Sequence, residues 1–491
     1  MIDEAFAAMV ERQADLPAVV DGGTRMSYGE LAERRMAVAH YLSASLAVRE
    51  GSRVAVQLPN SWEFIAVFLA LARIGAVCVP LNPHWRAKEL EWCAGSLEFA
   101  AVVTTERLQE LWRSLDSTWG GRILPAGKIA GIGRSAAGAR RTGARYADEP
   151  AFCILTSGST GIPKVAVRSH RRAVASAGAV ADALGVVSGQ RSLCVVPFHH
   201  AHGISNCMLL SLVRGCTAVV MRAFAPANLA ALVLREKVQI LSASPFIFRA
   251  LTESGCRARD FASVETCVSS GAAVPRGLAE RCSGELGLGI RELYGSSETG
   301  AIAIGPPAAE AEPGCVGRPL PTVEVRIAGP DGAPLPAGAE GEILVRCPAL
   351  MKGYLLDAGE TDDRFAGGWF HTGDLGRIGE SGDLRLCGRI RHVINVSGIK
   401  VDPVEIERVL RRLPEVRDCC VRGATLPRQN EIVEAVIALR PGCSLPRKTL
   451  VEHCRRHMAE YKIPRSIVFV DEIPRDLLGK VPASFWSIAG K

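Results

Sequence analysis

The chain has 491 residues, a length that suits about three globular domains or two large ones. Hydrophobic residues make up 48% and charged residues 22% of the sequence, and these values exclude a disordered chain and a coiled coil. The net charge of +7 is mild for this length; it suits an anionic small-molecule substrate, and no basic run interleaved with aromatic residues indicates nucleic acid.

The N-terminal part of the chain alternates between helix-like and strand-like segments. Apolar spacing predicts helices over 28–46 and 62–74 and strands over 53–58 and 76–81. Strands separated by helices of this length imply parallel crossovers and therefore an α/β sheet. The pattern then fades into Gly, Ala and Arg over 108–146, which we interpret as a connection of unspecified structure.

A glycine-rich loop over 156–164 follows an apolar run, 151–155, that indicates a buried strand. Gly158 and Gly161 let backbone N–H groups turn toward one point, and Lys164 adds a fixed positive charge. The loop is therefore suited to binding a phosphate. The alternative is an ordinary surface loop rich in Ser and Gly.

Strand patterns continue beyond this loop. The predicted strands are Ser192 to Pro197, Thr217 to Met221, Ile240 to Pro245 and Glu265 to Gly271. The last two end in small residues, and ligands of open α/β sheets gather beyond such carboxyl ends.

The C-terminal third of the chain has a different pattern. Between Val323 and Val345, a strand, an Asp-Gly turn and a second strand predict antiparallel hairpins and a smaller subdomain. Beyond Gly388, two helices and several strands predict a compact α+β unit. We therefore expect an N-terminal domain over 1–388 and a C-terminal domain over 389–491.

Three further segments carry side chains suited to nucleotide chemistry. In 294–300, Tyr294 is suited to stacking on a base, Thr299 to donating to a phosphate and Glu298 to holding a divalent cation. Asp374, between glycines, is suited to accepting both ribose hydroxyls, and Lys480 to neutralising charge on a phosphoryl or carboxylate oxygen. The alternatives are a turn, an Asp in a hairpin loop and a lysine that faces solvent.

Taken together and in order, these segments resemble the adenylate-forming superfamily, which contains acyl-CoA synthetases, nonribosomal adenylation domains and firefly-type luciferases. The resemblance runs from Tyr28-Gly29-Glu30-Leu31 to Lys480. It implies an α/β fold with a large N-terminal domain, in which mixed and parallel sheets are layered with helices and joined to a β-rich subdomain. It also implies a small mobile α+β C-terminal domain, with the active site between the two.

The resemblance assigns ATP contacts to residues spread along the chain. It implies that the phosphates are held by Thr156, Ser157, Gly158, Ser159, Thr160, Gly161 and Lys164. It implies that adenine is framed by Gly271, Ala272, Ala273 and Tyr294, and that ribose is contacted by Asp374 and Arg389.

Catalytic roles follow from the same resemblance. Glu298 corresponds to the ligand of Mg²⁺ and Thr299 to a phosphate contact. Lys480 corresponds to the lysine that bridges the substrate carboxylate and the α-phosphate during adenylation. Gly398 and Lys400 belong to a segment that lines the entry of the CoA thiol in the second step.

The sequence departs from the family pattern at two places. Arg391-His392 stands at the hinge, where Asp or Lys followed by Asp is usual. Asp476 and Leu478 stand near the catalytic lysine, where Thr and Ser are usual. Asp476 and Leu478 leave open a catalytically weak relative that acts as a binding or regulatory protein.

Histidines mark the expected acid pocket in the segment 197–203. By resemblance His200 borders the substrate carboxylate, and His199 stands where an aromatic residue is common. The Asp with which amino-acid-activating relatives bind an α-amino group is absent here, so an aryl or fatty acid is favoured over an amino acid. The alternative is a set of histidines packed at a strand end without a ligand role.

The resemblance implies an acid–CoA ligase that uses ATP, Mg²⁺ and CoA. The close alternative is an acyl-AMP ligase that loads the thiol of a carrier protein; a luciferase-like oxygenation has no positive sign. The oligomeric state is left open, a homodimer being one option. The scattered cysteines favour a cytoplasmic protein without a zinc site or a disulfide framework, and the non-basic N-terminus does not resemble a signal peptide. The longest apolar run, Phe64 to Leu81, is interrupted by Arg73, Gly75 and Pro80, so we expect no membrane span.

Overall fold

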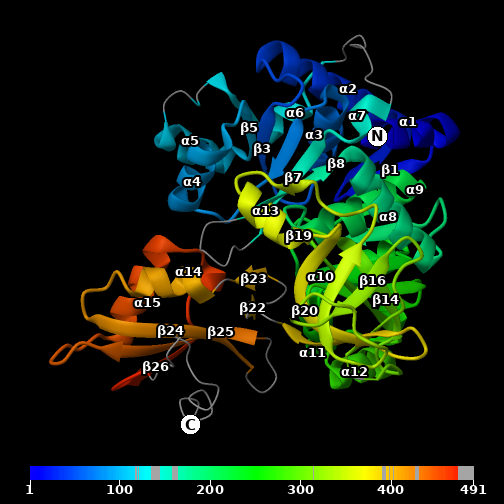
Figure 1. Ribbon diagram of the computed structural model, residues 1–491. Helices are drawn as coiled ribbons and strands as arrows, with labels where there is room; N and C mark the ends of the chain where they lie inside the picture. Colours follow the sequence, from blue (N-terminus) through cyan, green and yellow to red (C-terminus); the bar gives the residue numbers. More distant parts are fainter. Residues whose placement is uncertain are drawn as a thin grey trace. The chain divides into compact units, whose positions relative to one another are not determined.

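The computed structural model describes residues 1–116, 119, 121–133, 144–156, 164–312, 314–389, 394–396, 399–401, 403–425 and 431–473 (Figure 1). Over these residues the chain divides into two compact units. The larger unit comprises Met1–Pro83, Cys93–Leu155 and Val165–Ile390, and the smaller unit comprises His84–Trp92, Thr156–Lys164 and Arg391–Lys491. The domain boundary expected after residue 388 stays a prediction.

A largely parallel sheet forms one layer of the larger unit. Its strands run in the order β14-β13-β12-β11-β9-β10-β1-β2, and β14 and β2 are antiparallel to their neighbours. The strands are β1 (Pro17–Asp21), β2 (Thr24–Ser27), β9 (Arg191–Cys194), β10 (Thr217–Val220), β11 (Ile240–Ala243), β12 (Thr266–Ser270), β13 (Ile290–Ser296) and β14 (Gly300–Pro307).

A second sheet runs in the order β18-β8-β7-β4-β3-β5-β6. Its strands are β3 (Arg53–Gln57), β4 (Val77–Pro80), β5 (Ala101–Thr104), β6 (Ile123–Pro125), β7 (Pro150–Thr156), β8 (Lys164–Ser169) and β18 (Gly353–Tyr354). The predicted crossovers are present, because β3 pairs in parallel with both β4 and β5.

The helix α3 (Trp62–Ile74) lies between these two sheets, since it contacts both β4 and β1. It begins at Ser61, whose hydroxyl accepts a hydrogen bond from the N–H of Phe64 at 3.2 Å, and it ends at Gly75 in a left-handed conformation. Apolar residues on every side of the helix explain why it is buried along nearly its whole length.

A third, antiparallel sheet follows in the chain and is drawn in yellow in Figure 1. Its strands are β15 (Cys315–Gly317), β16 (Glu324–Ala328), β17 (Gly341–Arg346), β19 (Phe365–Ala366), β20 (Trp369–Ile378) and β21 (Leu384–Arg389). This sheet corresponds to the β-rich subdomain that the hairpin pattern predicted.

Helices alternate with these strands along the chain. They are α1 (Ile2–Gln13), α2 (Tyr28–Ser45), α4 (Ala87–Leu97), α5 (Gln109–Leu115), α6 (Ala126–Ile129), α7 (Ala144–Ala147), α8 (His170–Leu184), α9 (Leu210–Arg214), α10 (Pro226–Glu236), α11 (Pro245–Glu253), α12 (Arg276–Leu286) and α13 (Ala358–Arg364). A π-helical segment, Gly203–Leu209, precedes α9.

The smaller unit has its own apolar core. It contains the strand pair β22 (Ile394–Val396) and β23 (Ile399–Val401), the sheet β24-β25-β26 and the helices α14 and α15. The bounds of this sheet and these helices are β24 (Val416–Thr425), β25 (Glu431–Leu439), β26 (Ser466–Val470), α14 (Pro403–Leu410) and α15 (Arg447–His457).

The described residues of the connection at 108–146 form more regular structure than the sequence pattern indicated. The structure places there α5, the short edge strand β6, α6 and α7. Trp112 of α5 is fully buried and donates through its indole N–H to Gln57 Oε1 at 2.7 Å. Elements this short complete less than two periods of an apolar pattern, so periodicity alone does not detect them.

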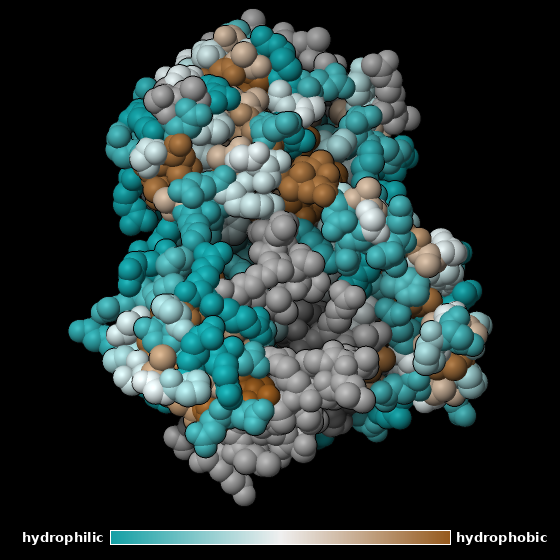
Figure 2. Space-filling view, turned by 60° about the vertical axis from the view of Figure 1, so that its left-hand side comes forward, coloured by the Kyte–Doolittle hydropathy of each residue, from teal (hydrophilic) through white to brown (hydrophobic). Residues whose placement is uncertain are grey.

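Polar residues predominate on the face of the molecule drawn in Figure 2. The exposed large apolar residues of the described chain are Leu16, Val187, Leu234, Phe246, Leu356 and Phe469. Across the described ranges, no helix combines the length and the apolar character that crossing a membrane requires.

A buried carboxylate ties the first three helices together. Asp3 in α1 is fully buried, and its Oδ1 lies 2.5 Å from Nη1 of Arg35 in α2. Its Oδ2 lies 3.4 Å from Nη1 of Arg73 in α3. Removing one partner of a buried ion pair leaves the other charge uncompensated, which is more costly than losing a surface pair.

We therefore expect Asp3→Ala to lower the free energy of unfolding by about 3–5 kcal/mol, because two buried arginines lose their carboxylate. The exposed pair between Asp182 and Arg214 provides the control, and Asp182→Ala is expected to cost at most about 1 kcal/mol. Urea titrations followed by circular dichroism measure both. Equal effects of the two substitutions would contradict this account.

Candidate active site

The predicted phosphate loop connects β7 to β8. Thr156 ends β7, Lys164 begins β8, and the Thr156 hydroxyl donates to the backbone carbonyl of Lys164 at 3.4 Å. The predicted phosphate contacts Ser157, Gly158, Ser159, Thr160 and Gly161 lie outside the described residues.

The predicted adenine contacts follow the ends of two adjacent parallel strands. Gly271, Ala272 and Ala273 come directly after β12, and Tyr294 lies near the carboxyl end of β13. Gly271 has a φ of +94°, a conformation that favours glycine. The structure therefore places these residues at the sheet edge where a ligand was expected.

Glu292 of β13 anchors the segment after β12. Its Oε1 accepts a hydrogen bond from the backbone N–H of Val274 at 2.6 Å. Burial raises the pKa of this carboxyl group. The sequence patterns did not indicate Glu292, because its partner lies on a different strand-to-helix connection.

Glu298 and Thr299 lie in the tight turn between β13 and β14. The Ser296 hydroxyl accepts hydrogen bonds from the N–H groups of Glu298 and Thr299, each at 3.2 Å. Thr299 is fully buried; its hydroxyl accepts from the N–H of Ser296 at 3.0 Å and lies 2.8 Å from the Gly300 carbonyl, to which it donates. The turn is thus fixed largely by its own hydroxyl groups.

The Glu298 carboxylate is held from the side by Tyr354, whose hydroxyl donates to Oε1 at 3.1 Å. Burial raises the pKa of Tyr354, and the adjacent Glu298 raises it further, so the phenol keeps the proton that it donates.

Arg168 of β8 holds the backbone of the same turn. It is nearly fully buried, and its Nη1 donates to the carbonyls of Ser297 at 3.2 Å and Glu298 at 3.3 Å. Burial lowers its pKa to about 10, so the guanidinium stays charged at neutral pH. Sequence analysis missed this residue, because its contact partners lie far along the chain.

Asp374, the predicted ribose contact, lies in β20 and is nearly fully buried. The Tyr294 hydroxyl donates to its Oδ2 at 2.8 Å. In the backbone pairing of β20 with β21, Asp374 lies opposite Arg389. The structure thus brings together residues predicted to contact adenine and ribose, although they come from two different sheets.

The histidines of the expected acid pocket follow β9. Nε2 of His202 lies 2.7 Å from the Ser242 hydroxyl at the end of β11, and the rings of His199 and His200 are 4.3 Å apart. Burial lowers the pKa of both His200 and His202 to about 4, so both imidazoles are neutral at neutral pH. His202 precedes the π-helical segment Gly203–Leu209, and such segments occur often at functional sites.

The remaining predicted site residues belong to the C-terminal part of the chain. Lys400 belongs to β23. Gly398, Lys480, the hinge residue Arg391 and the departures Asp476 and Leu478 lie outside the described residues. Their roles therefore stay predictions.

Comparison with known proteins places this arrangement in a family. The family model of AMP-binding enzymes matches residues 6–355, and the model of the AMP-binding enzyme C-terminal domain matches 405–480. A feruloyl-CoA synthase from an Amycolatopsis species is 31% identical, over 94% of this chain and 94% of that protein. A 2-succinylbenzoate–CoA ligase from Geobacillus kaustophilus is 31% identical, over 94% of this chain and 93% of that protein.

The fold is similar to that of a solved relative. The amide bond synthetase McbA from Marinactinospora thermotolerans superposes with a TM-score of 0.89 at 27% sequence identity, with 99% of each chain covered. The predicted α/β fold with its β-rich subdomain and separate C-terminal unit is confirmed by this likeness. The chain therefore belongs to the AMP-binding enzyme family, the adenylate-forming family that its motifs resemble.

Proposed function

We propose that this chain is an AMP-forming acid–CoA ligase. It activates a carboxylic acid with ATP as an acyl-adenylate, releases pyrophosphate, and transfers the acyl group to the thiol of CoA. Membership of the AMP-binding enzyme family and the likeness to two CoA ligases support this proposal.

The hydrogen bond between Tyr294 and Asp374 is the observation that carries the proposal. It joins the predicted adenine side of the site to the predicted ribose side at 2.8 Å. Glu298, the predicted metal ligand, follows Tyr294 after the end of β13. The predicted base and ribose contacts are therefore in direct contact with each other, and the predicted metal ligand follows four residues after Tyr294.

The chemistry explains why such a site needs ATP. A carboxylate resists nucleophilic attack, because attack on it must expel an oxide. In the first step a carboxylate oxygen attacks the α-phosphorus of ATP, the bond to the bridging oxygen breaks, and pyrophosphate leaves. In the second step the CoA sulfur attacks the acyl carbon, AMP leaves, and the thiol proton passes to solvent. Lys164 and Lys480 are proposed to stabilise the phosphate charge in the first step.

The residues present fit a magnesium ion. Among the described residues, no group of three or more His, Cys, Asp or Glu side chains could hold a metal alone. Mg²⁺ in ATP-using sites usually binds through one or two carboxylates together with substrate phosphates and water. Glu298, oriented by Tyr354, fits that mode. When bound, the ion would neutralise charge on the leaving pyrophosphate.

For the acid we propose an aryl or fatty acid. The segment 197–203 supplies neutral His200 and His202, and it contains no Asp or Glu that could bind an α-amino group. Ala272 and Ala273 after β12 add little side-chain volume, which favours an acid with a bulky or extended tail. Gly295 does not add to this space, because a Cβ atom there would clash with the carbonyl oxygen of Gly300.

The acceptor can be tested with the purified protein. ATP, Mg²⁺ and a panel of aryl, short-chain and long-chain acids are supplied with free CoA, with a carrier protein bearing a phosphopantetheine thiol, or with a simple amine. We expect an acyl-CoA product by mass spectrometry. If the only product is a thioester on the carrier protein, the carrier protein replaces CoA as the proposed acceptor. If the only product is an amide, the amine replaces it.

We expect Lys480→Ala to slow acyl-adenylate formation by about 100-fold or more, because charge on the transferring phosphoryl group loses its counter-ion. Transfer from a synthetic acyl-adenylate to CoA is expected to change by less than about threefold, since no phosphoryl group moves in that step. Pyrophosphate exchange and thioester formation measure the two steps separately.

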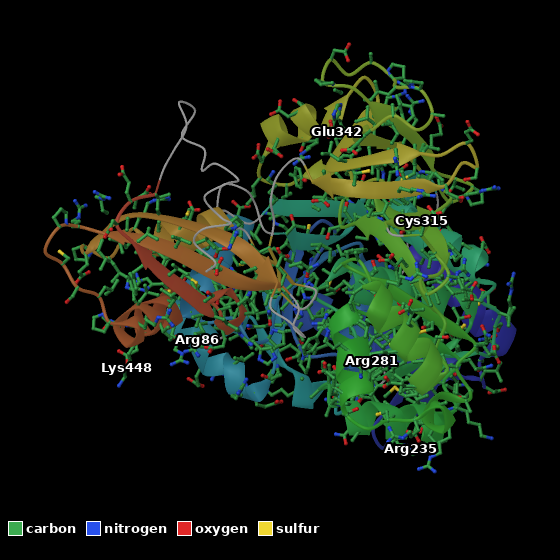
Figure 3. The ribbon with its side chains drawn as sticks, turned by 90° about the horizontal axis from the view of Figure 1, so that it is seen from below. Arg86, Arg235, Arg281, Cys315, Glu342 and Lys448 are labelled. Atoms are coloured by element: carbon green, nitrogen blue, oxygen red, sulfur yellow. The ribbon has the colours of Figure 1, made fainter. Side chains whose placement is uncertain are left out.

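Lys448→Ala is the matched control, because this lysine of α15 lies at the periphery in Figure 3. Normal pyrophosphate exchange in Lys480→Ala would contradict the assignment of the catalytic lysine.

We expect Glu298→Gln to raise the Mg²⁺ concentration that gives half-maximal pyrophosphate release by about tenfold, because the ion loses a charged ligand. Tyr354→Phe keeps the ring but removes the hydroxyl that orients Glu298, so a smaller shift in the same direction is expected. An unchanged magnesium titration in both variants would contradict this role.

The pH dependence of the first step tests the charge of the acid pocket. Because burial lowers the pKa of His200 and His202 to about 4, both side chains stay neutral from pH 5 to pH 8. We therefore expect kcat/KM for the acid in pyrophosphate release to show no histidine titration near pH 6.5. A decline above pH 6.5 that His200→Gln abolishes would show a charged imidazolium instead.

A further inference from the structure

Asp374 lies within a β-bulge of β20. In the pairing of β17 with β20, Glu342 lies opposite Leu375 and Leu344 lies opposite His371. Between these two pairs, β20 has the three residues 372–374, whereas β17 has only Ile343. Bulges of this kind bend a strand and turn a side chain away from the regular alternation, often next to active sites.

The bulge interrupts the ladder, so its backbone groups need other partners. The Thr372 hydroxyl donates to the Ile343 carbonyl at 2.7 Å and accepts from the N–H of Asp374 at 3.0 Å. Glu342 supplies the other contacts: Oε1 accepts from the N–H of Gly373 at 3.0 Å, and Oε2 lies 2.9 Å from Nδ1 of His371.

The opposite side of the bulge is held by Arg364 of α13, whose Nη1 donates to the His371 carbonyl at 3.0 Å. Gly373 has a φ of +74°, and a Cβ atom there would lie 3.1 Å from Nη1 of Arg364. Glycine is therefore required at this position, and the segment is confined between one carboxylate and one guanidinium group.

Glu342 thus holds Gly373, the residue that directly precedes Asp374 in the chain. Asp374 in turn accepts from the Tyr294 hydroxyl. If Gly373 shifted, the carboxylate of Asp374 would move relative to Tyr294. Glu342 itself is only partly exposed and, in Figure 3, lies in the yellow β-rich part of the chain.

We propose that Glu342 is a positioning residue that sets how strongly the enzyme selects for the ribose hydroxyls of ATP. It acts by fixing the bulge that carries Asp374, without contacting the nucleotide. This inference rests on the proposed function, in which Asp374 accepts hydrogen bonds from the ribose.

The test compares ATP with 2′,3′-dideoxyATP, which lacks both hydroxyls but keeps the reacting phosphates. Acid-dependent pyrophosphate release gives kcat/KM for each nucleotide. Hydrogen bonds to a charged group lead us to expect wild-type selectivity for ATP of about 10- to 100-fold. Asp374→Ala is expected to reduce this ratio to about one. A purely structural defect would lower both rates alike and leave the ratio unchanged.

Glu342→Ala is expected to reduce the ratio at least fivefold, toward that of Asp374→Ala. Glu342→Asp keeps the charge, but its side chain is too short to contact both Gly373 and His371, so the same reduction of the ratio is expected. This variant replaces Glu342→Ala in the test if the alanine variant does not fold. Glu342→Gln keeps an oxygen that can accept from Gly373 and is expected to stay within about threefold of wild type.

Glu324→Ala provides the matched control, because Glu324 lies in β16 of the same sheet and pairs with Arg346 at 3.6 Å, away from the bulge. Wild-type selectivity in both Glu342→Ala and Glu342→Asp, with selectivity lost in Asp374→Ala, would overturn the inference but keep the proposed function. Absence of acid-dependent pyrophosphate release from the wild type would overturn the proposed function itself.

Discussion

The hydrogen bond from the Tyr294 hydroxyl to Asp374 connects two sheets of different construction. Tyr294 lies at the end of a parallel strand, where α/β folds present ligand contacts. Asp374 comes from an antiparallel strand, at a place where the pairing of β20 with β17 is interrupted by a bulge. The predicted site therefore depends on the regular end of β13 and on the irregular bulge of β20, which must keep their relative position for this hydrogen bond to form.

Both halves of the proposed nucleotide site use the same physical device. On the metal side, Arg168 holds the backbone of the turn that carries Glu298, and Tyr354 orients the carboxylate. On the ribose side, Glu342 and Arg364 hold the backbone next to Asp374. In each case a charged side chain from another strand or helix forms hydrogen bonds with backbone groups of the segment that carries the predicted contact. Such preorganisation lowers the reorganisation needed when a charged substrate binds.

Much of the architecture could be predicted from the sequence. Alternating helix and strand patterns gave the parallel crossovers, and the Asp-Gly turn indicated the antiparallel sheet. The motif residues Tyr294, Glu298 and Asp374 could be recognised because each stands in a short segment of distinctive composition. Because these patterns lie within short segments, they can be recognised in a single sequence.

The supporting residues could not be predicted in the same way. Arg168 is 130 positions from Glu298 along the chain, and Glu342 is 31 positions from Gly373. Glu342 reaches Gly373 through the pairing of β17 with β20, whereas Arg168 of β8 reaches a turn that belongs to a different sheet. No local sequence pattern indicates either contact. The short helices and the strand between Leu108 and Tyr146 were not predicted for a related reason, because their burial depends on distant partners such as Gln57.

Isotope transfer tests the central claim most directly. The carboxylic acid that supports pyrophosphate release is labelled with ¹⁸O in its carboxylate and incubated with the enzyme, ATP, Mg²⁺ and CoA. If the acid is activated as an acyl-adenylate, one labelled oxygen must appear in AMP, because the carboxylate oxygen that attacks the α-phosphorus leaves with the phosphate. Label in inorganic phosphate with ADP as the other product, or unlabelled AMP, would contradict the account.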